Sequence, residues 1–339
     1  MTTPGEGHVR VYRGGDALPG ALAAERVAVL GYGHLGRSAA LNLRDSGVKI
    51  RIGNRHDEYA DQARADGFDV VPLDVAASDD IVCVFLPDEV IPDVFARDIA
   101  PVLRPGGAVV FASGYSLAFD LVHPPGTVDV LLVAPRMAGV SARTRYLAGE
   151  GFWTCVGVEA DRSGRARERM LGLADGIGAL RAGAGAIEMT AKTEATLDLF
   201  VEQTIGPLLG AAIMVAFEIG REAGIAPEAL VLEMYMSGEM EAVFRGFREM
   251  GFFRASEDHG PTAVFGGMAR ILELDREAIA LRFRAVLDDI KNGGFARRFQ
   301  DEAGNGYPML EMARAMMHGP SPISEAEKRL RHLAGPDRP

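Results

Sequence analysis

The stretch Arg26-Val-Ala-Val-Leu-Gly-Tyr-Gly-His-Leu-Gly36 decides the fold of this chain. Apolar residues at 26–31 predict a strand, and the glycines follow as Gly-x-Gly-x-x-Gly before a helix-forming stretch at 37–44. In this context Gly31 permits a tight turn, Gly33 lets a pyrophosphate approach the backbone, and Gly36 lets the helix pack on the strand. The helix N-terminus then presents unpaired N–H groups to the phosphates. The motif predicts dinucleotide binding; a glycine-rich turn in an unrelated α/β domain is the alternative.

From residue 26 to about residue 155, short apolar runs alternate with helix-forming stretches. This alternation is typical of βαβ units around a parallel sheet. We expect strands at 26–31, 48–53, 69–71, 81–85, 108–112, 129–133 and 153–158. The predicted fold class is therefore α/β, with an N-terminal Rossmann-type doubly wound parallel sheet.

After about residue 183 the sequence changes to helical periodicity with few strand signals. Leu208 to Phe217 is apolar almost all round, which predicts a buried helix. We therefore expect a C-terminal all-α domain. The predicted divisions are a lead-in at 1–24, a dinucleotide-binding domain at 25–183, an α-helical domain at 184–317 and a peripheral tail at 318–339.

The composition narrows the class of protein. With 339 residues, of which 48% are hydrophobic, the chain is long enough for about two domain cores. A net charge of −11 without any Lys/Arg-rich run argues against a nucleic-acid partner. Cys83 and Cys155 lie in apolar stretches, which favours core thiols in a reducing compartment. We see neither a run of about 20 apolar residues nor a signal-peptide pattern, so we expect a cytoplasmic enzyme with a small-molecule substrate and no membrane partner.

The second expected strand ends at Gly53, Asn54 and Arg55. Domains that take NAD usually carry Asp or Glu here, about 20 residues beyond the glycines, to bind the ribose hydroxyls. Arg55 instead offers a planar fork that pairs with a 2′-phosphate, which favours NADPH. Asp57 and Glu58 follow at once and would repel a phosphate, so NADH is the alternative, and Arg55 is then a solvated loop charge.

Two further strand ends face the expected crevice, because ligands bind at the carboxyl ends of strands in such sheets. The segment 86–90 should lie along the cofactor, and Ser113 with Gly114 should point to the nicotinamide side; ordinary strand-to-helix turns are the alternative. The residues expected to bind the cofactor are Gly31, Tyr32, Gly33, His34, Leu35, Gly36, Arg55, Leu86, Pro87, Asp88 and Gly114.

Carboxylates stand out in the helical half. Asp198 and Glu202 are four residues apart, so they share one helix face among apolar neighbours. Such a pair suits Mg²⁺, and a solvated helix face is the alternative. Farther on, Glu233 and Glu239 lie about 120° apart on a continuous helix, so they cannot easily bind one ion unless Gly238 breaks the helix. Tyr235 and Glu239 would share a face of that helix.

Together these segments resemble ketol-acid reductoisomerase (acetohydroxy acid isomeroreductase) of the short, class I type. The likeness covers roughly residues 10–315. It rests on the glycine segment 31–36, Ala39-Ala-Leu-Asn-Leu-Arg-Asp-Ser-Gly47, Leu86-Pro-Asp-Glu-Val90, Pro124-Pro125 with Val128-Asp-Val130, Val133-Ala-Pro135, Gly176-Ile-Gly178 with Arg181-Ala-Gly183, and Asp198-Leu-Phe-Val-Glu202-Gln203. In this order and at these spacings, the segments are highly specific for the family.

The resemblance implies an N-terminal Rossmann domain joined to a knotted all-α domain, in a homodimer whose second subunit completes each active site. Enzymes of the family rearrange 2-acetolactate by a Mg²⁺-assisted alkyl shift and then reduce the product with NADPH. On matching positions, Asp198 and Glu202 become the first metal-binding pair, Lys192 matches a catalytic lysine, and Glu239 matches the later carboxylate of the second metal-binding helix.

The sequence departs from the family pattern at several site positions. Where the second helix should carry a Glu-x-x-x-Glu pair, this register places Tyr235 at the first position, and a shift that restores Glu233 would put Ser237 at the second. The remaining replacements are Ser113 for a histidine, Arg136 for a lysine followed by Met137-Ala138 for Gly-Pro, and Gly260 for a serine. The resemblance therefore implies fewer metal ligands than the family uses.

Three functions follow from these departures. The first is an NAD(P)H-dependent, Mg²⁺-assisted reductase of a 2-keto or imino acid, with or without the isomerase step. Lys192, Glu239, Tyr235 and Ser113 are its candidate catalytic residues, with Tyr235 as a proton donor or a packed aromatic. The second is a true ketol-acid reductoisomerase, and the third is a non-catalytic dinucleotide-binding protein. His259 would orient the substrate or serve as a plain loop histidine.

Overall fold

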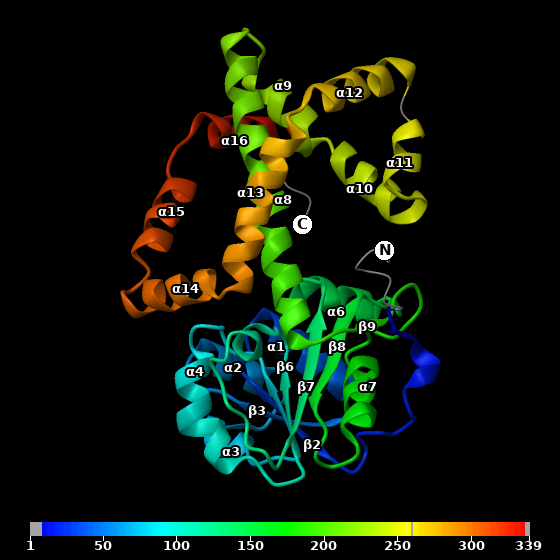
Figure 1. The fold of residues 1–339 in the computed structure, drawn as a ribbon, viewed down its shortest axis with the longest axis vertical. Coiled ribbons are helices and arrows are strands. Elements are labelled where there is room, and N and C mark those ends of the chain that lie inside the picture. The colour runs from blue at the N-terminus through cyan, green and yellow to red at the C-terminus, as the bar shows by residue number, and fades with distance from the viewer. Residues whose placement is uncertain (1–8, 259, 336–339) are drawn as a thin grey trace. The chain divides into compact units, whose positions relative to one another are not determined.

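The computed structural model describes residues 9–258 and 260–335. The chain forms two compact units, one up to Asp198 and one from Leu199 onward. Each unit is described by itself below, and its elements can be followed in Figure 1.

Within the described residues, the first unit contains a nine-stranded sheet with the order β1-β9-β8-β7-β6-β5-β2-β3-β4. All seven expected strands are present within about two residues of their predicted bounds. The strands are β1 (Val11–Tyr12), β2 (Arg26–Leu30), β3 (Lys49–Gly53), β4 (Val70–Val71), β5 (Ile81–Val84), β6 (Ala108–Phe111), β7 (Asp129–Pro135), β8 (Thr154–Ala160) and β9 (Ala186–Glu188). The strands from β4 to β7 are parallel, as predicted, but β8 runs antiparallel to β7.

Helices cover both faces of this sheet, which confirms the doubly wound prediction (Figure 1). They are α1 (His34–Asp45), α2 (Glu58–Ala65), α3 (Leu73–Ala76), α4 (Ile91–Val94), α5 (Tyr115–Ala118), α6 (Gly139–Leu147) and α7 (Ala166–Gly176). Alternate residues of β2 enter different cores, because successive side chains of a strand point to opposite faces. Val27 and Val29 pack with α1 and α7 residues, while Ala28 and Leu30 pack with α3 and α4 residues.

The lead-in is more ordered than its composition predicts. β1 pairs antiparallel with β9, so Val11 and Tyr12 join the edge of the sheet. The Tyr12 hydroxyl donates a hydrogen bond of 2.7 Å to Glu188 of β9, and Leu22 is buried in the core. The sequence analysis did not predict either strand; they are two and three residues long.

A buried ion network holds α7 against the amino end of β7. Arg169 of α7 donates to Asp129 at 2.8 Å and to Glu25 at 3.0 Å, and all three side chains are buried. Burial acts to raise the pKa of Asp129, but hydrogen bonds from Ser163, Arg162 and Arg169 hold it below its ordinary value. Asp129 is therefore a charged, fully hydrogen-bonded group rather than an orphan in the core.

The second unit is helical, as predicted. Helix α8 (Ala191–Glu222) begins in the first unit and continues into the second. It is followed by α9 (Pro227–Val231), α10 (Glu239–Met250), α11 (Phe252–Ala255), α12 (Pro261–Glu273), α13 (Arg276–Lys291), α14 (Gly294–Gly304), α15 (Pro308–His318) and α16 (Pro322–Ala334).

The expected peripheral tail belongs to the core of this unit. Ala326 of α16 is fully buried and packs with Phe217 of α8 and Val231 of α9. The prediction of a peripheral tail from 318 onward was wrong here. Most of α16 is charged, and its apolar face is too small to be recognised from the sequence without the helices that pack on it.

The middle of α8 is exposed within the chain, although its all-apolar sequence predicts burial. Leu208, Leu209, Met214 and Val215 are each about half exposed. By length and composition α8 is also apolar enough to cross a membrane, which the sequence analysis did not expect. One such helix is by itself weak evidence of a membrane span. The exposed side chains form an apolar surface on α8 that no other described part of the chain covers.

Candidate cofactor and active site

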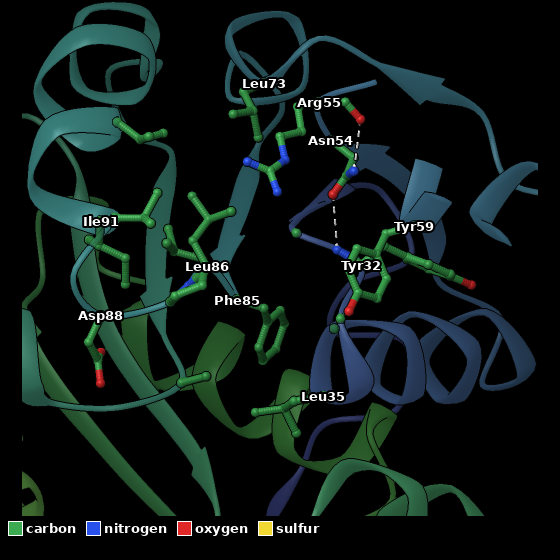
Figure 2. Close-up of a pocket in the computed structure, with 18 of the residues that line it drawn as sticks. Tyr32, Leu35, Asn54, Arg55, Tyr59, Leu73, Phe85, Leu86, Asp88 and Ile91 are labelled. Atoms are coloured by element: carbon green, nitrogen blue, oxygen red, sulfur yellow. Dashed lines mark hydrogen bonds between the residues drawn. The ribbon is translucent and has the colours of Figure 1, made fainter. Parts of the chain in front are cut away.

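A cavity of about 650 Å³ opens at the carboxyl ends of β2, β3, β5 and β6 (Figure 2). This is the place where doubly wound sheets bind their ligands. Most residues predicted for the cofactor line it: Gly31, Tyr32, Gly33, His34, Leu35, Gly36, Arg55, Leu86, Pro87 and Asp88. Ser113 lines it as well, whereas Gly114 is not among the lining residues.

The glycine loop has the geometry that the motif predicts. Gly31 has φ +90°, a left-handed conformation that side chains rarely adopt. A Cβ on Gly36 would lie 2.1 Å from the Gly31 carbonyl oxygen, so α1 can pack this close only with glycine there. A Cβ on Gly33 would meet no atom within 4 Å, so the loop backbone faces open space there. Gly33 is the N-cap of α1, and the helix therefore begins at the cavity.

Tyr32 anchors this loop to the rest of the unit. Its backbone N–H donates to the Asn54 side-chain oxygen at 3.2 Å, and its hydroxyl donates to Asp66 at 2.9 Å. The first of these bonds is drawn in Figure 2. Asn54 thus ties the end of β3 to the glycine loop, a role that the sequence analysis did not predict.

The end of β3 carries the group expected to recognise a 2′-phosphate. The Arg55 side chain is 83% exposed and extends toward the cavity near Leu73 in Figure 2. Its Nε donates to Asp57 at 2.8 Å, which leaves the two terminal nitrogens of the fork for a ligand. Asp57 caps α2 by accepting from the Tyr59 and Ala60 N–H groups. Burial acts to raise the pKa of Asp57, but hydrogen bonds from Arg55 and Ala60 keep it low, so it stays ionised.

Sequence reasoning missed several residues that line the same cavity. Asn54, Asp57 and Tyr59 lie around Arg55, and Arg97 enters from the turn that continues α4. Asn54 and Asp57 follow the end of β3, and this position could have predicted that they line the cavity. Nothing in the sequence near Arg97 separates it from an ordinary surface arginine.

A second cluster forms where β7 ends. Arg136 follows this strand and places its guanidinium between two carboxylates of α8, donating through Nη2 to Glu194 at 2.5 Å and through Nη1 to Asp198 at 2.6 Å. The Glu194 side chain is fully buried and also accepts from the Gly114 N–H at 2.6 Å. Burial raises the pKa of Glu194 above its ordinary value, although Arg136 opposes this. The sequence pointed to Asp198 but did not identify Glu194 as its neighbour.

Gly114 and Ser113 connect the two clusters. A Cβ on Gly114 would lie 2.2 Å from the Ala191 carbonyl oxygen, so this glycine lets the start of α8 approach the end of β6. Gly114 was expected at the cofactor; the structure gives it a packing role instead. The Ser113 hydroxyl oxygen lies at the cavity and accepts from the Tyr115 N–H at 3.1 Å.

The predicted magnesium ligands are only partly brought together. Asp198 and Glu202 lie one turn apart on α8, as expected, but Asp198 is already ion-paired. Among residues 9–258 and 260–335, no group of three or more His, Cys, Asp or Glu side chains is close enough to hold a metal. The described residues of one chain therefore do not bring the predicted ligands together, and the magnesium site stays a prediction. Lys192 is exposed in the first turn of α8.

In the second unit, Tyr235 and Glu239 lie on different elements. A π-helical turn (Leu232–Met236) contains Tyr235, and Gly238, with φ +84°, ends it before α10 begins at the exposed Glu239. The expected shared helix face therefore does not exist. The Tyr235 hydroxyl donates to Glu327 of α16 at 2.6 Å, and burial together with this carboxylate raises the pKa of Tyr235. His259 lies outside the described residues.

Known proteins match this arrangement along nearly the whole chain. Residues 21–183 match the family model described as acetohydroxy acid isomeroreductase, NADPH-binding domain, and residues 191–335 match that of the ketol-acid reductoisomerase C-terminal domain. A protein of Saccharolobus solfataricus named "Putative ketol-acid reductoisomerase 3" is 35% identical over 302 residues, covering 87% of this chain and 90% of its own.

Solved structures agree. An NADH-preferring ketol-acid reductoisomerase from an uncultured archean has a TM-score of 0.89 at 31% identity, covering 96% of this chain and 100% of its own. A semialdehyde dehydrogenase NAD-binding protein from Cupriavidus necator, at 20% identity and a TM-score of 0.55 over 77% of this chain and 99% of its own, shares only the fold. The chain belongs to the ketol-acid reductoisomerase family and is an NAD(P)H-dependent oxidoreductase.

Proposed function

We propose that this enzyme reduces a 2-keto or imino acid with NADPH and does not catalyse the alkyl shift. The observation that carries the proposal is the state of Tyr235, which stands where the resemblance places a metal-binding carboxylate. A phenol is a poor ligand for Mg²⁺, and its hydroxyl is occupied by Glu327 at 2.6 Å. The alkyl shift depends on two adjacent ions, whereas carbonyl reduction needs one cation or proton donor at the oxygen.

The cofactor cavity supports the reductive half of the reaction. When bound, the nicotinamide supplies a hydride. The glycine loop and the start of α1 would hold the pyrophosphate, and the terminal nitrogens of Arg55 would pair with a 2′-phosphate. Because Asp57 offsets part of the Arg55 charge, NADH is the competing cofactor, as the name of the archaeal homologue also suggests.

The test compares two substrates. NADPH and NADH consumption is followed with 2-acetolactate and with 3-hydroxy-3-methyl-2-oxobutanoate, its rearranged form, each with and without Mg²⁺. We expect turnover of the rearranged ketone only. Turnover of both would support the second candidate, a true ketol-acid reductoisomerase, which the two family matches favour. Cofactor binding without turnover of any 2-keto or imino acid would leave the third candidate, a dinucleotide-binding protein.

We further propose a cytoplasmic homodimer in which the second subunit completes each active site. The support is the apolar surface of the second unit, where Phe253, Phe265 and Leu272 are each about 80% exposed. Patches of this kind mark association surfaces in soluble proteins. Light scattering after size exclusion should give twice the mass of the chain, and a monomeric mass at working concentration would refute this.

A further inference from the structure

The guanidinium of Arg136 lies between two carboxylates of α8, those of Glu194 and Asp198. Its distances to Glu194 and Asp198 are 2.5 and 2.6 Å, and its own side chain is 26% exposed. Glu194 is in turn bonded to the N–H of Gly114, the residue next to Ser113 in the cavity wall. Arg136, Glu194 and Asp198, which together form a guanidinium clamp, therefore lie next to the wall of the cofactor cavity at Ser113.

The guanidinium of the clamp opposes a divalent ion at Asp198. Mg²⁺ binds carboxylate oxygens at about 2.0–2.1 Å and requires near-octahedral surroundings. Asp198 Oδ1 already accepts from Arg136 Nη1, so an ion on this carboxylate would lie beside the guanidinium, and the two like charges would repel. Within the described residues of one chain, no group of three or more His, Cys, Asp or Glu side chains lies close enough to add further ligands.

We infer that Arg136 takes the place of a divalent metal at Asp198, and that the reductase works without one. This inference rests on the proposed reductase function. A guanidinium has five N–H donors. One goes to Asp198 and one to Glu194, and the buried Nε donates to no described residue. The two remaining terminal N–H donors, one on each Nη atom, are suited to the oxygens of a 2-keto acid, where they polarise the carbonyl as a metal would.

Binding of Mn²⁺, followed by the electron paramagnetic resonance signal of the free ion, tests the inference without reference to turnover. We expect no stoichiometric site in the wild type. Arg136→Gln leaves the two carboxylates without their cation, so Mn²⁺ affinity should rise by about a hundredfold or more. Adding Asp198→Asn to this variant should abolish the gain. Arg136→Lys, whose ammonium is a point charge and cannot bridge both carboxylates, serves if the glutamine variant does not fold.

A matched control is Arg143→Gln on α6, which removes a similarly exposed arginine paired at 2.6 Å with Asp45 of α1 and should leave Mn²⁺ binding unchanged. A stoichiometric Mn²⁺ site in the wild type that Asp198→Asn removes would overturn the inference. The inference would also be overturned if neither Arg136 variant gained Mn²⁺ affinity while both still bound NADPH. Turnover that persists with a chelator supports it, and turnover that is lost with a chelator contradicts it. If no substrate is turned over, the proposed function fails while the Mn²⁺ result still decides this inference.

Discussion

Replacing Arg55 with glutamine should weaken NADPH and spare NADH. A charge-assisted hydrogen bond contributes about 1.5–3 kcal/mol. Arg55 is 83% exposed, so solvent and salt screen it, and its Nε is already engaged by Asp57. We therefore take the lower end, about 1.5 kcal/mol, which corresponds to a roughly tenfold rise in the Kd of NADPH. The Kd of NADH, which has no 2′-phosphate, should change by less than about twofold.

The assay is a fluorescence titration of both cofactors at low and high salt, with the difference shrinking at high salt because the charge is exposed. Asp57→Asn should act in the opposite direction and tighten NADPH, since asparagine keeps the α2 cap while it releases Arg55. Arg64→Gln is the control, because Arg64 is an α2 arginine paired with Asp61 and does not line the cavity. Equal loss of both cofactors in Arg55→Gln, or tighter binding of NADH by the wild type, would refute the reasoning.

Three further outcomes follow from the structure. Gly36→Ala should abolish cofactor binding, measured by the same titration, because its Cβ would lie 2.1 Å from the Gly31 oxygen; a variant that folds by circular dichroism and binds normally would contradict this. Tyr235→Phe should lower the free energy of unfolding by about 1 kcal/mol in urea through loss of its bond to Glu327, with kcat unchanged, whereas a fall in kcat beyond tenfold would make Tyr235 a proton donor. Asp129→Asn should lower the free energy of unfolding by about 3 kcal/mol, because it leaves the buried Arg169 without this carboxylate. Because the folded pKa of Asp129 is lowered, its contribution is present above the ordinary Asp pKa and lost as pH falls through the folded value, so the difference from wild type in urea melts should shrink in acid.

The local sequence pattern was enough to predict most of the secondary structure of the first unit. The β-branched runs and the glycine spacing act within a few residues, so the strands, the turn at Gly31 and the helix start at Gly33 follow from short-range sterics. Ten of the eleven residues that this reasoning predicted for the cofactor line the cavity. The reasoning misplaced Gly114, whose role depends on Ala191, a residue far along the chain.

The second unit shows the opposite case. An apolar stretch such as Leu208 to Phe217 predicts burial, but the sequence does not say whether the cover comes from the same chain. Within this chain it is largely exposed. Likewise, the small apolar face of α16 became visible only through its packing with Phe217 and Val231.

The sequence by itself determined the dinucleotide-binding architecture and the family, because these depend on spacings that a chain carries locally. Only the tertiary structure decided how the charges around Asp198 are paired. Arg136, Glu194 and Asp198 come from β7 and α8, and their pairing depends on how the start of α8 meets the end of β6 at Gly114. Charge pairing falls off over a few ångströms, so its outcome rests on contacts between distant segments that no local pattern records.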